Sequence, residues 1–189
     1  MVYIVFEGID GSGKTTQIPL VEKELKKYVD TSIHILKETE IESVHPVIDT
    51  LNYARQRGEL LPSNIVECDD IFLCDRSYFS SLAYQGMSRE MLAYVRQVNS
   101  FVPTPDIIIY LDHEPKRKDY DTLEETHYMS KVYANYSNVI PIKSLCLDTR
   151  VLSIKETTSL IVDHILRMLP RQHIINIGDF DGCMKNSSE

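Results

Sequence analysis

Residues 8–15 carry the most specific chemical pattern in the chain. They read GIDGSGKT and fit G-x-x-x-x-G-K-[ST], in which glycines let backbone amides converge on phosphate oxygens. The helix expected to begin at the Lys-Thr pair adds the positive end of its dipole. The pattern predicts a phosphate-binding loop made of Gly8, Ile9, Asp10, Gly11, Ser12, Gly13, Lys14, Thr15 and Thr16.

Four side chains extend this prediction to a triphosphate with Mg²⁺. Lys14 is expected to reach the β and γ phosphate oxygens, and the Thr15 hydroxyl to ligate Mg²⁺. Asp75 ends an apolar run and should stand at the tip of a buried strand as a second Mg²⁺ ligand; the alternative is a helix-capping or surface carboxylate. Arg76 comes next, and its planar guanidinium suits a phosphate held through two hydrogen bonds.

Strand-like and helix-like segments alternate along the chain and must position these residues. Apolar runs predict five strands, at Val2–Glu7, Ile33–Lys37, Asp70–Asp75, Asp106–Asp112 and within Val139–Leu147. Amphipathic segments predict helices at Thr15–Tyr28, Val44–Arg57, Ser80–Tyr84, Arg89–Phe101, Glu124–Tyr136 and Ile154–Leu169. This order predicts an α/β fold of the three-layer P-loop NTPase type, with a five-stranded parallel sheet flanked by helices. Ligands of such sheets bind at the carboxyl ends of the strands.

Length and composition favour one globular domain over residues 1–189. The polar stretch 113–122 is expected to be a mobile loop, and the tail 171–189 is expected to fray. No run approaches the about 18 apolar residues that a membrane helix needs. The net charge of −8 argues against a general nucleic-acid-binding protein. The four cysteines form no C-x-x-C pair, which predicts reduced thiols in the cytoplasm.

Two blocks taken together resemble the thymidylate kinase family. They are Phe6–Gln17 (FEGIDGSGKTTQ) and Asp75–Gly86 (DRSYFSSLAYQG). The resemblance implies a P-loop nucleoside-monophosphate kinase that moves the γ-phosphate of ATP onto dTMP. It also implies ATP and Mg²⁺ as cofactors, dTMP as the acceptor substrate, and a homodimer.

The resemblance also implies roles for individual residues. Asp10 corresponds to a carboxylate that approaches the nucleotide sugar and the phosphate centre, and Arg76 grips the acceptor or the transferring phosphoryl group. Tyr84 resembles the aromatic residue that crowds the 2′ position and favours deoxyribose. The acceptor-site segment implied in this way contains Ser80, Ser81, Tyr84 and Gln85.

The segment 53–57 (YARQR) resembles the aromatic-Ala-x-x-Arg segment of the family. Tyr53 and Arg57 are four residues apart and share a helix face. In this interpretation Tyr53 stacks on a pyrimidine, and Arg57 donates to its O4 carbonyl, which favours thymine or uracil over cytosine. The alternative is a core tyrosine beside a solvated arginine.

The chain departs from the family pattern after its second strand. Family members normally carry Arg-Glu-Pro-Gly-Gly there, or a related turn with proline and arginine, and its arginine binds the acceptor phosphate. This chain reads LKETE over residues 36–40. Lys37 and Arg55 are the candidate replacements. Neither of them is a guanidinium held by a rigid turn.

The polar loop at 113–122 contains the basic run Lys116–Lys118. Family members with glycine at the position of Gly11 are expected to supply positive charge from this lid. Arg117 is the best candidate, because a planar fork suits a developing metaphosphate. This prediction completes the catalytic set of Asp10, Lys14, Arg76 and Arg117, and its alternative is a solvated basic run.

Two other functions remain open from the sequence. One is a P-loop kinase for a different small acceptor, either a nucleoside or another deoxynucleoside monophosphate, since the acceptor-phosphate turn is missing. The other is a nucleotide-binding module without turnover, which the shortened lid motivates.

Overall fold

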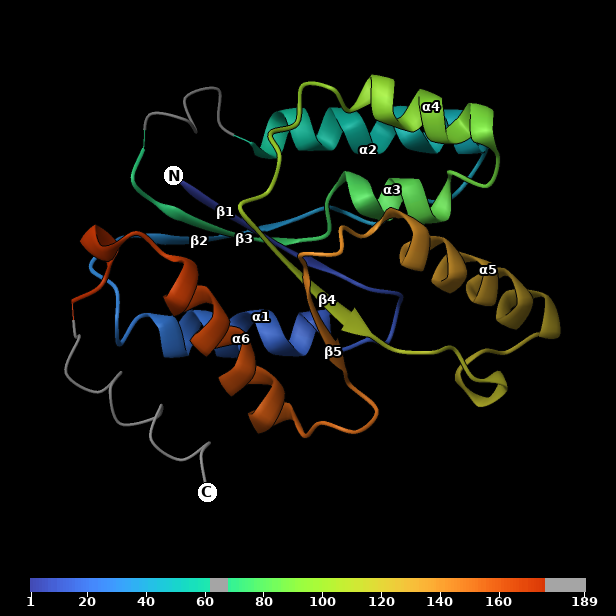
Figure 1. Ribbon diagram of the computed structural model, residues 1–189. Coiled ribbons are helices and arrows are strands. Elements are labelled where there is room, and N and C mark those ends of the chain that lie inside the picture. The colour runs from blue at the N-terminus through green and yellow to red at the C-terminus, as the bar shows by residue number, and fades with distance from the viewer. Residues whose placement is uncertain (62–67, 176–189) are drawn as a thin grey trace.

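The computed structural model describes residues 1–61 and 68–175, with the backbone alone at Arg117. Within this part the chain forms a five-stranded sheet in the order β2-β3-β1-β4-β5 (Figure 1). All neighbouring strands are parallel, which confirms the expected fold. The strands are β1 (Val2–Glu7), β2 (Ile33–Lys37), β3 (Ile71–Asp75), β4 (Ile107–Asp112) and β5 (Leu145–Asp148).

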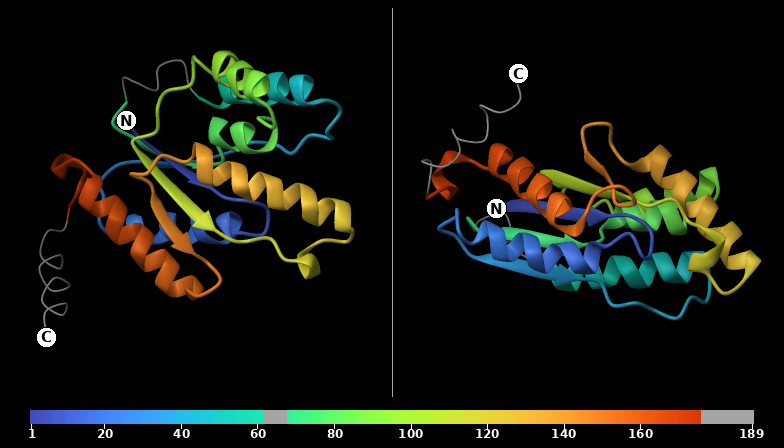
Figure 2. Two further views of the ribbon diagram at one scale, coloured as in Figure 1. Left: turned by 45° about the vertical axis from the view of Figure 1, so that its right-hand side comes forward. Right: turned by 90° about the horizontal axis from the view of Figure 1, so that it is seen from below.

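Helices cover both faces of the sheet, as Figures 1 and 2 show. On one face lie α1 (Lys14–Leu25) and α6 (Ile154–Met168). On the other lie α2 (Pro46–Leu60), α3 (Tyr78–Tyr84), α4 (Arg89–Val98) and α5 (Leu123–Val139). Two short 3₁₀ turns, η2 (Arg117–Asp119) and η3 (Arg171–His173), complete the described elements.

The central strand β1 is apolar on both faces because both faces are covered. Val2, Ile4 and Phe6 pack into the core beneath α1 and α6. Tyr3 and Val5 point the other way, into the core beneath α3 and α4. All six residues of the strand are buried, which explains why its sequence is hydrophobic from Val2 to Phe6.

Local signals set the helix boundaries. Helix α2 begins at Pro46, two residues after the predicted start, because the extended residue His45 caps it by accepting from the amide of Val47 at 3.3 Å. Helix α5 begins after Thr122, which forms a capping box with Glu125. Helix α1 ends at Leu25, three residues earlier than expected.

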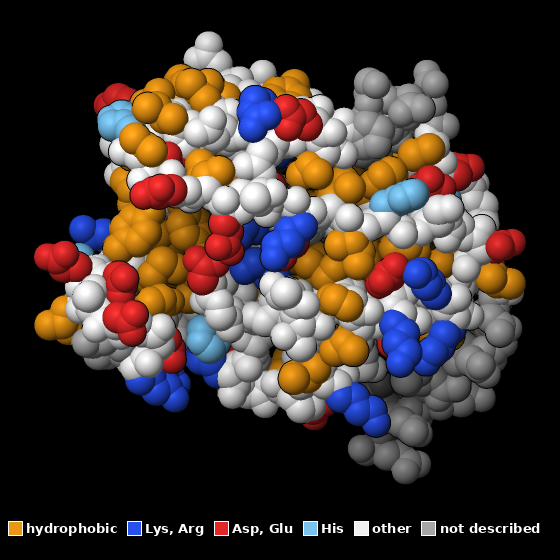
Figure 3. Space-filling view, turned by 180° about the vertical axis from the view of Figure 1, so that it is seen from behind, with side chains coloured by type: hydrophobic (Ala, Val, Ile, Leu, Met, Phe, Trp, Pro, Cys, Tyr) orange, Lys and Arg blue, Asp and Glu red, His pale blue; other side chains and the backbone are white. Residues whose placement is uncertain are grey.

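The chain beyond α6 stays attached to the body of the protein as far as it is described. Ile174 bridges to Val29, and the amide of Ile175 donates to the carbonyl of Tyr28 at 2.8 Å. The remainder of the predicted frayed tail, residues 176–189, lies outside the described residues. None of the described helices has both the length and the apolar character to cross a membrane. Figure 3 shows basic, acidic and hydrophobic side chains interspersed over one face.

The fold gathers the candidate chemistry at one edge of the sheet. The loop after β1 and the residues after β3 are neighbours, because Phe6 pairs with Asp75 in the sheet register. On the other side of β3, Lys37 at the end of β2 also pairs with Asp75. This edge is the carboxyl end of three adjacent parallel strands, where ligands of such sheets bind.

Candidate active site

The loop between β1 and α1 has the backbone that a phosphate cradle requires. Gly8, Gly11 and Gly13 have φ values of 142°, 79° and 99°, a region that residues with side chains rarely adopt. At Gly8 an added Cβ would lie 2.5 Å from the Leu111 carbonyl oxygen. Gly13 is the N-cap of α1, so the positive end of the helix dipole lies at the loop.

Lys14 is folded back into this loop. Its Nζ donates to the carbonyl oxygens of Gly8 and Ile9 at 2.8 and 2.9 Å, and to the hydroxyl of Ser12 at 3.4 Å. Burial, followed by repulsion from Arg76, lowers the pKa of Lys14 to about 8. The ammonium is therefore a buried cation whose charge an incoming phosphate would stabilise.

We expect the affinity for Mg·ATP to fall as the pH rises above about 8, where Lys14 loses its proton. Bound triphosphate raises the pKa of Lys14 again, so binding at pH 9 takes up a proton. Calorimetry in two buffers of different ionisation enthalpy measures this uptake.

Lys14 affects the stability of the fold in the opposite direction from its effect on Mg·ATP binding as the pH rises. The pKa of Lys14 in the folded protein, about 8, lies below its ordinary value of 10.5, so its contribution to the free energy of unfolding rises as the pH increases between these two values. If a Lys14→Met variant took up as many protons on binding Mg·ATP as the wild type, the proton uptake could not be assigned to Lys14.

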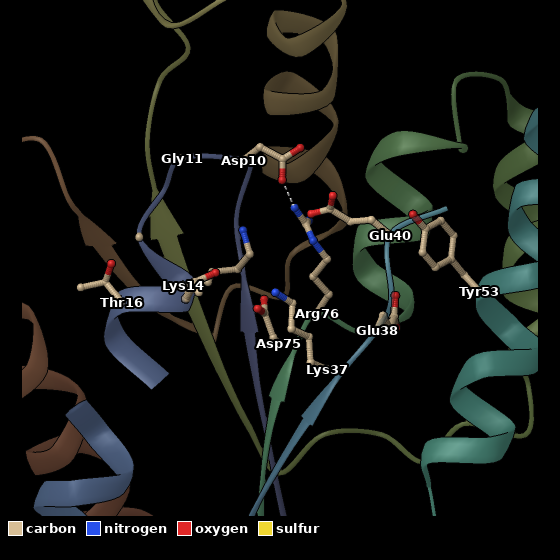
Figure 4. Close-up of a pocket in the computed structure, with 12 residues that line it drawn as sticks. Asp10, Gly11, Lys14, Thr16, Lys37, Glu38, Glu40, Tyr53, Asp75 and Arg76 are labelled. Atoms are coloured by element: carbon tan, nitrogen blue, oxygen red, sulfur yellow. Dashed lines mark hydrogen bonds and ion pairs between the residues drawn. The ribbon is translucent and has the colours of Figure 1, made fainter. Parts of the chain in front are cut away.

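Asp75 ends β3 inside a cavity that Lys14 and Thr15 also line (Figure 4). The carboxylate is buried, and its Oδ1 atom finds no hydrogen-bond partner among the described residues. Thr15 adds a hydroxyl at the start of α1. Carboxylate and hydroxyl oxygens are ligands that Mg²⁺ accepts, so this pair fits the predicted metal site.

Arg76 is held in a strained position beside the loop. It is the one non-glycine residue with a positive φ, 80°, in the described part of the chain, a conformation that costs about 1–3 kcal/mol. Its guanidinium pairs with Asp10 and lies 5.2 Å from the ring centroid of Tyr84. The Tyr84 hydroxyl in turn donates to Asp10 at 3.1 Å, and burial raises the pKa of Tyr84, so the phenol stays a donor.

A second cavity adjoins the first, and the two share a wall of Asp10, Glu38, Glu40, Tyr53 and Arg76. The structure brings all eight residues predicted to bind the acceptor together around this second cavity. They are Asp10, Tyr53, Arg57, Arg76, Ser80, Ser81, Tyr84 and Gln85. The predicted donor and acceptor sites are therefore continuous.

Arg57 is buried with a relative exposure of 3%, so it is not a solvated surface charge. It forms a two-point ion pair with Glu38 at 2.5 and 3.0 Å. It also donates to Asn99 Oδ1 at 2.7 Å and to Ser81 Oγ at 2.9 Å. Protein acceptors thus engage its nitrogens, and the guanidinium lies 5.9 Å from the centroid of the Tyr53 ring.

Glu38 is a site residue that the sequence analysis missed. Burial raises its pKa although the charge of Arg57 acts in the opposite direction. The segment 36–40 lacks the arginine of other family members, and its informative feature is Glu38, which pairs with Arg57. A charged residue directly after a strand that ends at the site was the available signal.

Lys37 and Arg55, the two candidate replacements for the missing arginine, lie in different places. Lys37 lines the first cavity at the end of β2, and Figure 4 shows it among the site residues. Arg55 pairs with Glu59 on the exposed side of α2 at 2.5 Å. Of these two residues, only Lys37 belongs to the described lining of either cavity.

The predicted lid lies at the edge of the described site. Lys116 and Lys118 are exposed, and neither belongs to the described lining of the two cavities. The Lys116 amide donates to Asp119 Oδ2 at 2.9 Å, which fixes the turn η2. The side chain of Arg117 lies outside the described residues.

Comparisons with known proteins agree with this geometry. The family model described as Thymidylate kinase matches residues 6–119. A probable thymidylate kinase of Pyrobaculum aerophilum is 37% identical over 61% of this chain and 66% of its own length, just under two thirds. A probable thymidylate kinase of Methanobrevibacter smithii is 30% identical over 74% of this chain and 81% of its own. A thymidylate kinase of Thermoanaerobacter is 31% identical over 73% and 83%, respectively.

Proposed function

The chain belongs to the thymidylate kinase family, and we propose that it transfers the γ-phosphate of ATP to dTMP in the two joined cavities. One observation carries this proposal: Asp10 and Arg76 stand in the wall that both cavities share. A phosphoryl group crossing from donor to acceptor stays beside the same guanidinium throughout. The enzyme is a nucleoside-monophosphate kinase, as the resemblance of the two sequence blocks implied.

The donor side binds ATP through the loop after β1. Its amides and Lys14 hold the phosphates, and the first turn of α1 faces them. Thr15 and Asp75 would hold Mg²⁺, which supplies charge neutralisation at the β and γ phosphates. The unpaired carboxylate oxygen of Asp75 supports this role. In phosphoryl transfer the protein contributes alignment and electrostatic stabilisation rather than covalent chemistry.

The acceptor side reads the base through Gln85. Its Oε1 atom is buried and finds no hydrogen-bond partner among the described residues, and the residue lines the second cavity. Thymine and uracil present an N3–H donor to such an acceptor, whereas cytosine does not. Arg57 contributes less to this readout than the resemblance implied, because Glu38, Asn99 and Ser81 already engage it.

The acceptor phosphate meets two cations. Arg76 supplies the guanidinium from the shared wall, and Lys37 supplies a point charge where other family members carry an arginine. No general base is required, because a phosphate oxygen of dTMP is already anionic. We assign Arg117 to the lid charge that completes the site, since its loop leads directly into α5.

The same proposal includes the oligomeric state, the cellular compartment and the domain organisation of the enzyme. It acts as a homodimer in the cytoplasm, and residues 1–189 form one kinase domain. Family membership supports the dimer. The absence of a C-x-x-C pair in the sequence supports a reducing compartment.

An acceptor panel tests the proposal. Purified protein with Mg·ATP is supplied with dTMP, dUMP, dCMP, dGMP or thymidine, and nucleotide products are quantified. We expect dTMP to have the highest kcat/KM. A preference for thymidine would replace the proposal with a nucleoside kinase. Mg·ATP binding without transfer to any acceptor would replace it with a nucleotide-binding module.

We expect Gln85→Leu to lower kcat/KM for dTMP by about 10- to 100-fold, because the N3–H of the base then enters the cavity unpaired. The KM for ATP should stay unchanged, and the melting temperature should not fall, because the Oε1 atom has no described partner to lose. Gln97→Leu on the exposed surface of α4 is the matched control. Equal losses for ATP and dTMP would indicate general misfolding instead of base recognition.

A further inference from the structure

Glu7 is a completely buried carboxylate that the reaction scheme above does not use. It ends β1 with a relative exposure of 0%. One oxygen accepts from the amide and hydroxyl of Ser77 at 2.8 and 2.7 Å. The other accepts from Ser80 Oγ at 2.6 Å and from the Tyr136 hydroxyl at 3.1 Å. No ion pair with a described cation satisfies this charge. Burying a carboxylate without a counter-ion is costly, and here four hydrogen bonds offset that cost and fix the groups around Glu7.

Tyr136 links this carboxylate to the reaction centre. Its hydroxyl lies 2.9 Å from Ser80 Oγ and 3.4 Å from both the Gly8 carbonyl oxygen and the Nη1 atom of Arg76. The side chain is fully buried, with Tyr110 at 5.5 Å and Tyr84 at 6.2 Å between ring centroids. One hydroxyl therefore contacts β1, the phosphate loop, α3 and Arg76 from a ring that is fixed by packing.

The direction of these hydrogen bonds determines how the network aligns the Arg76 guanidinium. Tyr136 donates its proton toward Glu7, which leaves a lone pair toward Arg76. Burial raises the pKa of Tyr136, so it keeps that proton. Among the described residues, the hydrogen-bond partners of Arg76 Nη1 are neutral oxygens alone, those of Gly8, Ser80 and Tyr136 at 3.2–3.4 Å. The Nη2 atom pairs instead with Asp10, which is an exposed residue, and the guanidinium lies 5.2 Å from the centroid of the Tyr84 ring. The buried side of the guanidinium is consequently aligned by groups that Glu7 orients.

We propose that Glu7 and Tyr136 are positioning residues, which hold the Arg76 guanidinium at the junction of the two cavities and connect it to α5. This inference rests on the proposed function only for the changes in kcat that it predicts. Helix α5 starts directly after the segment 113–122, and Tyr136 lies near its other end. The helix thus joins the predicted lid to the side chain that grips the transferring phosphate. Neither residue lines a cavity among the described residues, so both act through Arg76.

Tyr136→Phe tests this inference, because it removes the hydroxyl and retains the ring. We expect kcat with dTMP to fall about tenfold, the effect of one misaligned hydrogen-bonded contact in the transition state. The KM values for ATP and dTMP should change less than about twofold. Tyr94→Phe on α4, outside both cavities, is the control and should retain the wild-type kcat.

A double-mutant cycle separates positioning from a structural role. In an Arg76→Ala background, Tyr136→Phe should cause no further loss of kcat, because the group it positions is absent. A tenfold loss that persists in that background would overturn the proposal, as would a wild-type kcat for the single variant.

A measurement without substrate keeps this inference distinguishable from the proposed function. The Nε–H signal of Arg76 in ¹⁵N-labelled protein, assigned from its loss in Arg76→Lys, reports how firmly the guanidinium is held. We expect its solvent exchange to speed up about tenfold in Tyr136→Phe, by the same hydrogen-bond loss. Unchanged exchange refutes the positioning role. Faster exchange in a protein that phosphorylates no acceptor would support the positioning role and refute only the kinase assignment.

Discussion

Lys14→Met should lower turnover with dTMP by at least about 10³-fold, the largest effect that we expect from one side chain. The ammonium is the one positive charge of the phosphate loop, and methionine keeps the length of the side chain without this charge. The protein should still fold. Lys14 is a buried cation with a lowered pKa, so its neutral replacement removes a desolvation cost together with three hydrogen bonds. Steady-state formation of dTDP and the melting temperature, measured on one preparation, check both statements.

Lys23→Met is the matched control for this variant. Lys23 lies on the same helix and is exposed near its last turn, so its turnover should equal that of the wild type. Near-wild-type activity of Lys14→Met would refute the whole assignment of the loop, including the pH dependence of Mg·ATP binding.

Gly8→Ala should unfold or displace the loop. The added methyl group would lie 2.5 Å from the Leu111 carbonyl oxygen and 2.7 Å from Ser12 Oγ, at a backbone φ of +142°. The Leu111 oxygen belongs to β4 and cannot yield without moving the sheet. We expect the free energy of unfolding to fall by more than about 3 kcal/mol, with Mg·ATP binding lost in calorimetry. Denaturant titration measures the first quantity.

Gly58→Ala is the contrasting control for Gly8→Ala. Gly58 lies within α2, and its added methyl group would meet the Phe101 ring at 3.7 Å, an ordinary contact. Alanine is the better helix former, so this variant should gain about 0.5–1 kcal/mol of stability. If the two substitutions had similar effects, the backbone argument for the phosphate loop would be wrong.

The sequence predicts the fold and the donor site well because their signals are local. A buried strand such as β1 reads as a run of apolar residues, and the loop that follows is encoded within eight positions. The pairing of Asp75 with the loop also follows, since parallel strands end at one edge. The prediction that Tyr53 and Arg57 lie at one site came from the resemblance of residues 53–57 to a family segment together with their four-residue spacing. Both residues line the second cavity.

The remaining features depend on contacts between distant segments. Arg57 forms hydrogen bonds with Glu38, 19 residues away in the sequence, and with Asn99, 42 residues away. No local sequence pattern predicts either partner. Tyr136 reaches Glu7 across 129 positions. Tyr136 reads in the sequence as one more apolar residue of an amphipathic helix, and Glu7 as the end of a strand. The positive φ of Arg76 is likewise invisible, because arginine has no preference for that conformation.

The wall common to both cavities has a thermodynamic consequence. A ligand that draws Arg76 away from Asp10 in one cavity would change the charge that the second ligand meets in the other, and the two binding equilibria would then be coupled. Linkage then demands reciprocity: whatever factor dTMP imposes on the dissociation constant of ATP, ATP imposes on that of dTMP. In that case the two cavities would bind their ligands as one coupled site.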